Sequence, residues 1–223
     1  MKISAIIVAA GSSRRMGFDK LEADLGGKPV LAHSILAFQN CKVVSEIRVV
    51  SSSGKMESVA ALAKEIEATK FVESVEGGAE RHLSVSKGLH RVGADCDLVA
   101  VHDGARPLVS PEAISDCAQV AYDFGAATLA HRVSDTLKRG NEELEVTGSI
   151  SREDLWAMET PQIFRRELLI EAYLKILKDG ELVTDEVSAI QALGHPVKLV
   201  DNGLPNLKIT VPGDLLEAAS ILE

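Results

Sequence analysis

The chain has 223 residues, of which 46% are hydrophobic, and it carries a formal net charge of −9. This length and composition suffice for one sizeable core, so we expect a single domain over residues 1–223. The acidic balance argues against a nucleic-acid-binding protein, which normally carries a basic face. The apolar runs are shorter than the ~20 residues that a membrane-spanning helix requires. Three separated cysteines, Cys41, Cys96 and Cys117, support neither a disulfide framework nor a zinc site. We therefore expect a soluble, cytoplasmic protein that binds neither nucleic acid nor membranes.

Apolar strand-like runs alternate with segments of helical period along most of the chain, which is typical of an α/β fold with a largely parallel sheet. In chain order we predict a strand at 3–10, a helix at 30–39, a strand at 46–51, a helix at 55–67, a strand at 70–73 and a helix at 80–92. We then predict a strand at 98–101, a helix at 111–123, a strand at 126–133, helices at 165–178 and 184–193, a strand at 196–201 and a helix from Pro212.

The alternation is interrupted at residues 134–152, which are polar and β-like. This segment predicts two short strands about a turn at Gly140-Asn141. It is too polar to cover a core, so we interpret it as a projecting β-arm, and such arms commonly contact a partner subunit. A solvated surface hairpin is the alternative.

The first predicted strand is followed by a Gly/Ser-rich loop that carries Arg14, Arg15 and, slightly later, Lys20. Small residues allow backbone N–H groups to approach phosphates, and cationic side chains can neutralise charge that develops during a reaction. The loop lacks the three-glycine spacing of a dinucleotide fingerprint and the Gly-Lys-Ser/Thr ending of a nucleotide-hydrolase loop. These side-chain cations therefore suggest a triphosphate held for attack at phosphorus. A solvated loop is the structural alternative.

Three unusual segments each begin where a predicted strand ends: residues 11–20, 77–84 and 102–107. Ligands of an open α/β sheet bind beyond the carboxyl ends of its strands, so one fold would bring these segments to the same edge. Asp103 is either a buried cap for the next turn or a ligand for a ribose hydroxyl or Mg²⁺. Arg106 either reaches the same ligand or ties its loop down.

Weaker signals accompany these segments. Gly77 and Gly78 would let the backbone approach a base edge, and Ser84 would supply a hydroxyl, although glycine pairs are usually only turns. Thr184 is the predicted N-cap of the helix that follows it. Lys208 lies in a short β-like run before the last helix and is a candidate for a second phosphate contact. The default interpretation is an ordinary lysine exposed on the surface.

Together these motifs resemble the 2-C-methyl-D-erythritol 4-phosphate cytidylyltransferases of the non-mevalonate isoprenoid pathway. The resemblance extends over nearly the whole chain, although the opening loop alone is shared by many sugar nucleotidyltransferases. The motifs that carry it are Ala9 to Gly17 with Lys20, Gly77 to Arg81 with Ser84, Val101 to Pro107, Asp135-Thr136, Thr160-Pro161-Gln162, Thr184-Asp185-Glu186 and Asn206 to Thr210. It implies a Rossmann-like nucleotidyltransferase fold, with a mostly parallel central sheet flanked by helices and a projecting β-arm.

The resemblance also implies roles for single residues. Arg15 and Lys20 would stabilise the transition state at the α-phosphate, and Asp103 would lie by the ribose and a Mg²⁺ ion. The residues that would bind the nucleotide are Ala9, Ala10, Gly11, Ser12, Gly77, Gly78, Ser84, Asp103 and Arg106. Those that would hold the sugar phosphate are Lys208, Asp135, Thr136 and Arg152, with Thr136 and Arg152 reaching into the site from a partner's arm. The family is homodimeric and uses Mg²⁺.

The implied reaction joins CTP and 2-C-methyl-D-erythritol 4-phosphate by in-line attack at the α-phosphate, with release of pyrophosphate. Two positions depart from the family pattern: Ser13 stands where the family often has glycine, and Ala79 replaces a common acidic residue. A cytidylyltransferase for ribitol 5-phosphate or another polyol phosphate is the nearest alternative. A molybdopterin-type nucleotidyltransferase is more distant, since that similarity is confined mostly to the opening loop. A non-catalytic nucleotide-binding regulator is the alternative from another class.

Overall fold

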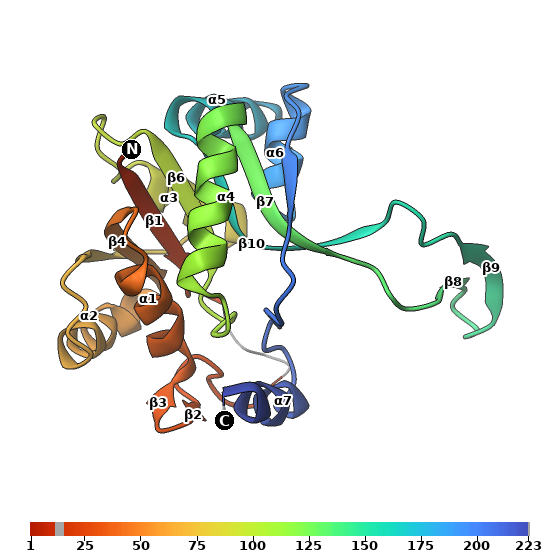
Figure 1. Ribbon diagram of the computed structural model, residues 1–223, viewed down its shortest axis with the longest axis horizontal. Helices are drawn as coiled ribbons and strands as arrows, with labels where there is room; N and C mark the ends of the chain where they lie inside the picture. The colour runs from red at the N-terminus through yellow and green to blue at the C-terminus, as the bar shows by residue number, and fades with distance from the viewer. Residues whose placement is uncertain (12–15, 223) are drawn as a thin grey trace.

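The computed structural model describes residues 1–11 and 16–222 (Figure 1). The central sheet within these residues consists of β1 (Ile3–Val8), β4 (Val44–Ser51), β5 (Phe71–Glu76), β6 (Leu98–Asp103), β7 (Ala126–Arg132), β10 (Trp156–Arg165) and β11 (Lys198–Asp201). Their spatial order is β11-β7-β10-β6-β1-β4-β5. Strand β10 runs antiparallel to both of its neighbours, whereas the other neighbouring pairs are parallel. The predicted α/β class and mostly parallel sheet are confirmed.

Helices cover both faces of the sheet. The helices are α1 (Val30–Asn40), α2 (Met56–Glu65), α3 (Arg81–Leu89), α4 (Pro111–Phe124), α5 (Arg166–Asp179), α6 (Glu186–Ala192) and α7 (Pro212–Leu222), with a 3₁₀ turn η1 (Ser53–Lys55) and a small hairpin of β2 (Asp24–Leu25) and β3 (Lys28–Pro29). Apolar residues of α1, α2, α4 and α7 belong to one core cluster, and those of α3, α5 and α6 belong to a second. The two clusters lie on opposite faces of β1 and β6, which explains why these strands are almost continuously apolar.

Helix α4 illustrates how local sequence sets the element boundaries. Ser110 is its N-cap, and the Ser110 hydroxyl accepts the N–H of Ala113 at 3.0 Å. Pro111 follows at the first helical position, where its missing N–H costs no hydrogen bond. Gly125 ends the helix with φ of 94°, a left-handed conformation that glycine adopts without steric cost. These signals account for the agreement between the predicted and observed helix.

Strand β10 was missed in the prediction from sequence. Pro161 interrupts its apolar pattern, and a proline normally argues against a central strand because it cannot donate to the ladder. The pairing of β10 with β7 is irregular between Met158 and Gln162, and this irregularity accommodates the proline. Because β10 runs antiparallel, its beginning lies at the edge where β6 and β7 end. The sheet edge therefore gains a set of side chains that the sequence pattern did not predict.

The predicted β-arm is present as a separate two-stranded sheet of β8 (Leu137–Gly140) and β9 (Val146–Ile150). Figure 1 shows the arm extending away from the rest of the molecule. Its turn is closed by Asn141, whose backbone N–H donates to the Glu145 carbonyl at 3.1 Å and whose side chain accepts the Glu145 N–H at 2.8 Å. Leu144 and Val146 are 94% and 71% exposed, so the tip of the arm presents apolar side chains to solvent.

Two local predictions were wrong. The N-cap of α6 is Asp185 and not Thr184, because the Asp185 carboxylate accepts the N–H of Ser188 at 3.0 Å. The run around Lys208 is not a strand, since residues 205–210 carry no regular secondary structure. Within the described parts of the chain, no helix combines the length and apolar character of a membrane span.

Candidate active site

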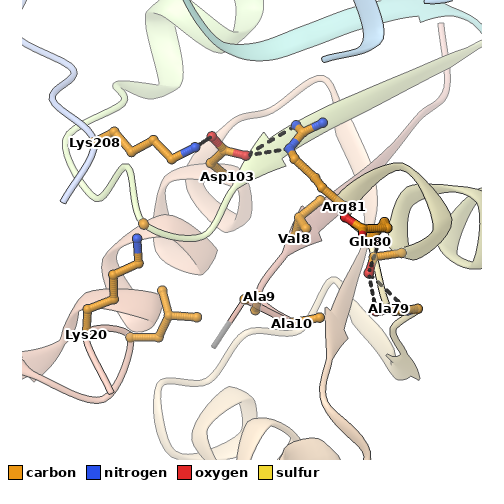
Figure 2. Close-up of a pocket in the computed structure, with 14 residues that line it drawn as sticks. Val8, Ala9, Ala10, Lys20, Ala79, Glu80, Arg81, Asp103 and Lys208 are labelled. Carbon is orange, nitrogen blue, oxygen red and sulfur yellow. Dashed lines mark hydrogen bonds and ion pairs between the residues drawn. The ribbon is translucent and has the colours of Figure 1, made fainter. Parts of the chain in front are cut away.

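A pocket of about 370 Å³ lies at the edge of the sheet where β1 and β6 end (Figure 2). It brings together these residues predicted from the sequence: Ala9, Ala10, Gly11, Lys20, Gly78, Ser84, Asp103 and Lys208. They come from the three segments that were expected to converge and from the C-terminal segment. The convergence is a consequence of the parallel pairing, which places the carboxyl ends of β1, β4, β5 and β6 at one edge.

The end of β1 contributes backbone to the pocket. Ala9 donates its N–H to the Val50 carbonyl at 2.7 Å, so the chain keeps its alignment with β4 just beyond the end of β1. Ala10 and Gly11 follow along the pocket wall. The predictions for Ser12 and Arg15 fall on residues 12–15, which lie outside the described residues.

Lys20 extends into the pocket from the segment between β1 and β2 (Figure 2). Its Nζ donates to the Ile209 carbonyl at 2.6 Å. The segment that carries Lys20 is fixed by α1, whose first two N–H groups donate to the carbonyls of Ala23 and Leu21, both at 3.0 Å. This pairing satisfies helix donors that otherwise have no intrahelical acceptor. The ammonium group is therefore held at the pocket by an anchored segment.

The Gly77-Gly78 pair allows a close approach between the end of β5 and its surroundings. A Cβ atom on Gly77 would lie 2.5 Å from the Ala10 Cβ, and one on Gly78 would lie 2.5 Å from the Leu83 Cβ. The Ser84 hydroxyl accepts the Gly78 N–H at 3.0 Å and donates to a carbonyl one turn earlier at 3.1 Å. Here this hydroxyl closes the glycine loop onto α3, and its expected contact with a base stays a prediction.

Asp103 ends β6, and its carboxylate faces two cations. The Lys208 Nζ lies 2.7 Å from one carboxylate oxygen, and the Arg81 guanidinium donates to the other at 3.2 Å. Burial raises the pKa of Asp103, but Arg81 and Lys208 outweigh this effect and hold the pKa well below its ordinary value. The side chain is therefore an ionised group at the pocket and does not cap the following turn.

Arg81, at the start of α3, was not predicted as a site residue. Its guanidinium donates to both carboxylate oxygens of Glu186, at 2.7 and 3.0 Å, as well as to Asp103. Glu186 is fully buried, and its carboxylate also accepts the Tyr173 hydroxyl at 3.0 Å. Burial would lower the pKa of Arg81, but the carboxylates of Glu186 and Asp103 raise it well above its ordinary value. Arg81 thus stays charged and ties Asp103 to the interior of the protein.

Arg106 lies next to this group and holds two backbone segments. Its guanidinium donates to the Asn206 carbonyl at 2.6 Å and to the Met158 carbonyl at 3.2 Å. These contacts agree with the interpretation in which Arg106 ties its loop down, and its expected contact with the ligand stays a prediction. Arg106 also lines a second hollow of about 440 Å³, and Lys208 lines this hollow as well as the first pocket. Lys208 therefore stands between two adjoining spaces.

His102 is fully buried in β6 and organises the same edge. Its Nε2 lies 3.1 Å from the Arg106 carbonyl, and its Nδ1 lies 3.0 Å from the Thr160 hydroxyl. A carbonyl can only accept, so we assign the hydrogen to Nε2, and Nδ1 accepts from Thr160. The Thr160 oxygen in turn accepts the Asp103 N–H at 3.0 Å. This chain of hydrogen bonds requires a neutral ring, and burial lowers the pKa of His102 to about 4.

Comparison with known proteins identifies the family. A family model described as IspD, 2-C-methyl-D-erythritol 4-phosphate cytidylyltransferase, matches residues 3–223. The chain belongs to this family. The family predicted from the sequence motifs is therefore confirmed, and with it the prediction of an enzyme of the nucleotidyltransferase class.

Relatives and solved structures agree with the family model. The 2-C-methyl-D-erythritol 4-phosphate cytidylyltransferase of Alkaliphilus oremlandii is 39% identical over 100% of this chain and 95% of its own length. That of Caldanaerobacter subterraneus is 40% identical over 100% of this chain and 99% of its own length. The crystal structure of the Thermus thermophilus protein of this name superposes with a TM-score of 0.82 at 31% identity, covering 97% of both chains.

The two departures from the family pattern fall at different places. Ala79 lines the pocket between Gly78 and Glu80, so the missing acidic side chain makes this wall less negative. Ser13 lies outside the described residues.

The arm residues expected to hold the sugar phosphate lie away from the pocket of their own chain. Asp135, Thr136 and Arg152 are exposed, and Arg152 donates to the Ser134 carbonyl at the base of the arm. They line neither the pocket at β1 and β6 nor the adjoining hollow. The structure therefore does not bring them together with Lys208 within one chain.

The pocket offers a modest donor set for Mg²⁺. Among the described residues, no group of three or more His, Cys, Asp or Glu side chains could hold a metal ion. Magnesium ions in nucleotide sites are usually bound by one or two carboxylates together with substrate phosphates, so a single ionised carboxylate fits this role. Asp103 lies in the pocket and has a lowered pKa, and it is the candidate ligand.

The buried His102 leads to a prediction about pH. Its pKa is about 4 in the folded chain and about 6.5 when unfolded, so its stabilising effect is complete above pH ~6.5 and is lost as the pH falls through about 4. We expect this group to lower the free energy of unfolding by on the order of 3 kcal/mol between pH ~7 and pH ~4.

Urea denaturation of wild type and His102→Gln over this pH range measures the free energy of unfolding of each protein. The variant should be less stable at neutral pH but should lose less stability on acidification, whereas the exposed control His90→Gln should follow wild type. Equal pH dependence in all three proteins would contradict the assignment.

Proposed function

We propose that the protein transfers the cytidylyl group of CTP to 2-C-methyl-D-erythritol 4-phosphate in the cytoplasm, as a step of non-mevalonate isoprenoid biosynthesis. The products are 4-diphosphocytidyl-2-C-methyl-D-erythritol and pyrophosphate. The observation that carries the proposal is the cation-lined pocket at the carboxyl edge of the sheet, with Lys208 shared between it and a second hollow. Two adjoining spaces with a shared cation suit a reaction between two phosphate compounds.

The reaction is an in-line displacement. A phosphate oxygen of the sugar alcohol forms a bond to the α-phosphorus of CTP, and the bond from that phosphorus to pyrophosphate breaks. No general base is required, because a phosphate monoester with a second pKa near ~6 is largely dianionic at neutral pH. The obstacle is repulsion between two anions, and fixed positive charge and positioning lower it.

The described pocket supplies that positive charge. Lys20, Arg81 and Lys208 line it, together with the carboxylates of Glu80 and Asp103, and Glu186 binds Arg81 from the interior. These described charges balance, so the attraction for an anionic nucleotide depends on where the ammonium groups of Lys20 and Lys208 lie and not on an excess of cations. We assign Lys20 to the α-phosphate, where negative charge develops in the transition state. Arg15 is proposed to act with it.

The remaining pocket residues would hold the nucleotide. Backbone at Ala9, Ala10 and Gly11 and at the Gly77-Gly78 loop would contact CTP, and Asp103 would lie by the ribose. The second hollow is the proposed place of the acceptor, with Lys208 contacting its phosphate. Mg²⁺, held by Asp103 and the nucleotide phosphates, would stabilise the pyrophosphate leaving group as a Lewis acid.

We further propose that residues 1–223 form one domain and that the arm, residues 134–152, forms a homodimer. The exposed apolar tip and the extended shape in Figure 1 support this, since an isolated hairpin gains little stability of its own in water. Thr136 and Arg152, together with Asp135, would then complete the acceptor site of the partner subunit.

The Arg152→Ala variant tests the arm. We expect it to raise the KM for the sugar phosphate by on the order of 10-fold, because one charge-assisted contact to a phosphate is lost. Steady-state kinetics with each substrate varied in turn measures it, with Arg139→Ala on the same arm as the matched control. A change in the CTP KM alone would show that the arm assignment is wrong.

A mixing experiment tests whether the site is shared between subunits. Lys208→Ala and Arg152→Ala proteins, each weakly active, should regain activity after subunit exchange, because a mixed dimer contains one site with both residues intact. Unchanged activity after exchange, verified by native mass spectrometry, would place both residues in one chain's site.

Pyrophosphate release with CTP and a panel of polyol phosphates tests the function itself. We expect turnover with 2-C-methyl-D-erythritol 4-phosphate, with ATP, GTP and UTP as matched controls for the base and phosphorus NMR to identify the product. Preference for ribitol 5-phosphate would correct the acceptor. Binding of CTP with Mg²⁺ but no release with any acceptor would establish a regulator instead.

A further inference from the structure

Glu159 is a buried carboxylate at the start of β10, beyond the residues that the reaction has accounted for. It is 3% exposed, and its two oxygens have three partners. One oxygen lies 2.6 Å from Nδ1 of His131, at the end of β7. The other accepts the side-chain amides of Asn202 at 2.8 Å and Asn206 at 3.0 Å. Both asparagines belong to the irregular segment that follows β11 and leads to Lys208.

This segment is held by individual contacts, several of them from side chains. Residues 202–210 form no helix and no strand in the structure, although the Asn202 N–H donates to the Ala130 carbonyl at 2.8 Å and so continues the pairing of β11 with β7 by one bond. The Asn206 amide donates to Glu159 and also to the Thr160 carbonyl at 2.9 Å. The Asn206 carbonyl accepts from Arg106, and the Ile209 N–H donates to the Ala105 carbonyl at 2.8 Å. Glu159 therefore binds the segment at two points, four residues apart, just before the lysine.

We propose that Glu159 is a positioning residue for Lys208. Through Asn202 and Asn206 it fixes the segment from which the Lys208 ammonium reaches Asp103, and thereby places this charge between the nucleotide pocket and the acceptor hollow. The inference rests on the proposed function, in which Lys208 contacts the acceptor phosphate. Glu159 also lines the acceptor hollow, and we assign its effect to the asparagines that it holds; a direct contact with the acceptor would instead add to the loss caused by Lys208→Ala.

The hydrogen bonds of Glu159 indicate which substitutions distinguish its role in placing the segment from the effect of its negative charge. A glutamine at 159 has one amide oxygen, which can accept from both asparagines, and its NH₂ group can donate to an unprotonated His131 Nδ1. A methionine has similar length but accepts neither amide, so both asparagines would be left buried without their acceptor. The Gln variant thus keeps the hydrogen bonds to Asn202 and Asn206 without a negative charge, and the Met variant removes these hydrogen bonds.

The test is a double-mutant cycle on kcat/KM for the sugar phosphate. We expect Glu159→Met to lower it by about 10²-fold, the scale of a ~1 Å misplacement at a reacting centre. Glu159→Gln should recover most of this loss. In a Lys208→Ala background, Glu159→Met should cause little further loss, because the group that it positions is already absent. The KM for CTP should change much less than that for the acceptor.

Two further variants keep the test decisive. Asn206→Leu leaves Glu159 and His131 in contact and should reproduce the acceptor defect even if Glu159→Met folds poorly. Glu46→Met removes a partly buried carboxylate near the start of β4, at the opposite end of the strand from the pocket, and should lower stability without changing the acceptor KM.

Additive losses for Glu159→Met and Lys208→Ala, or no rescue by Gln, would overturn the proposal. An inactive wild-type protein would instead overturn the proposed function.

Discussion

Replacing Lys20 by alanine is expected to lower kcat by on the order of 10²-fold or more, the scale observed when one preorganised donor to developing charge is lost. Lys20 reaches the pocket from a segment pinned to α1, so its ammonium group needs little reorganisation on catalysis. The effect should fall on kcat, because charge on the α-phosphate oxygens is greatest in the transition state. Single-turnover measurements with saturating CTP and acceptor isolate this step.

Matched variants separate the role of Lys20 from a general effect of charge. Lys28→Ala removes the same charge from the exposed β2–β3 hairpin nearby and should leave kcat unchanged. Lys20→Arg keeps the charge with a different geometry and should be intermediate. Melting temperatures should show that Lys20→Ala remains folded, although the contact to the Ile209 carbonyl is lost. A folded Lys20→Ala protein with near-normal kcat would remove the residue from the mechanism.

The pocket was predictable from the sequence because its parts follow strands directly. Ala9, Ala10 and Gly11 come straight after β1, Gly78 comes two residues after β5, and Asp103 ends β6. Once the strands are predicted as parallel, their carboxyl ends must lie together, so the neighbours of those ends do too. The prediction required only local patterns and one rule of topology.

The charge network behind the pocket was not predictable in this way. Glu186 is separated from Arg81 by 105 residues, and from the sequence it was named only within the Thr184-Asp185-Glu186 motif at a helix start. The neighbouring Asp185 takes the capping role, which leaves Glu186 on the face of α6 that packs inward. No periodicity distinguishes these two adjacent acids, since the choice depends on where α3 and Arg81 lie.

Glu159 was missed for a related reason. It lies in β10, whose apolar pattern is broken by Pro161, and its asparagine partners lie in a segment without a repeating pattern. Irregular backbone gives no periodic signal, and the position of this segment depends on long-range hydrogen bonds and on the burial of Ile209 in the core. The side chains that place Lys208 are thus the ones that local sequence describes least.

The largest stability effect is expected for Glu186→Leu, which should lower the free energy of unfolding by about 3–5 kcal/mol, the cost of leaving a buried charge without its partner. Arg81 would keep Asp103 but lose both donations to Glu186, and the Tyr173 hydroxyl would lose its acceptor. Because the Arg81 side chain is 26% exposed, some rehydration should place the value at the lower end of this range. Urea denaturation measures this loss of unfolding free energy, and an unchanged m-value would show that the variant has changed in stability and not in the compactness of its folded or unfolded state.

Removing the cation as well should recover part of that loss. In the double variant Arg81→Met with Glu186→Leu, neither side chain leaves a buried charge behind, and Asp103 keeps Lys208 as its partner. Replacing a buried ion pair by apolar residues of similar size is often neutral or stabilising, so the double variant should be more stable than Glu186→Leu alone. Asp179→Ala, which removes the exposed partner of Lys175 on α5, is the control and should change stability by less than about 1 kcal/mol. Purely additive losses would mean that the Arg81–Glu186 contact does not couple the two residues energetically.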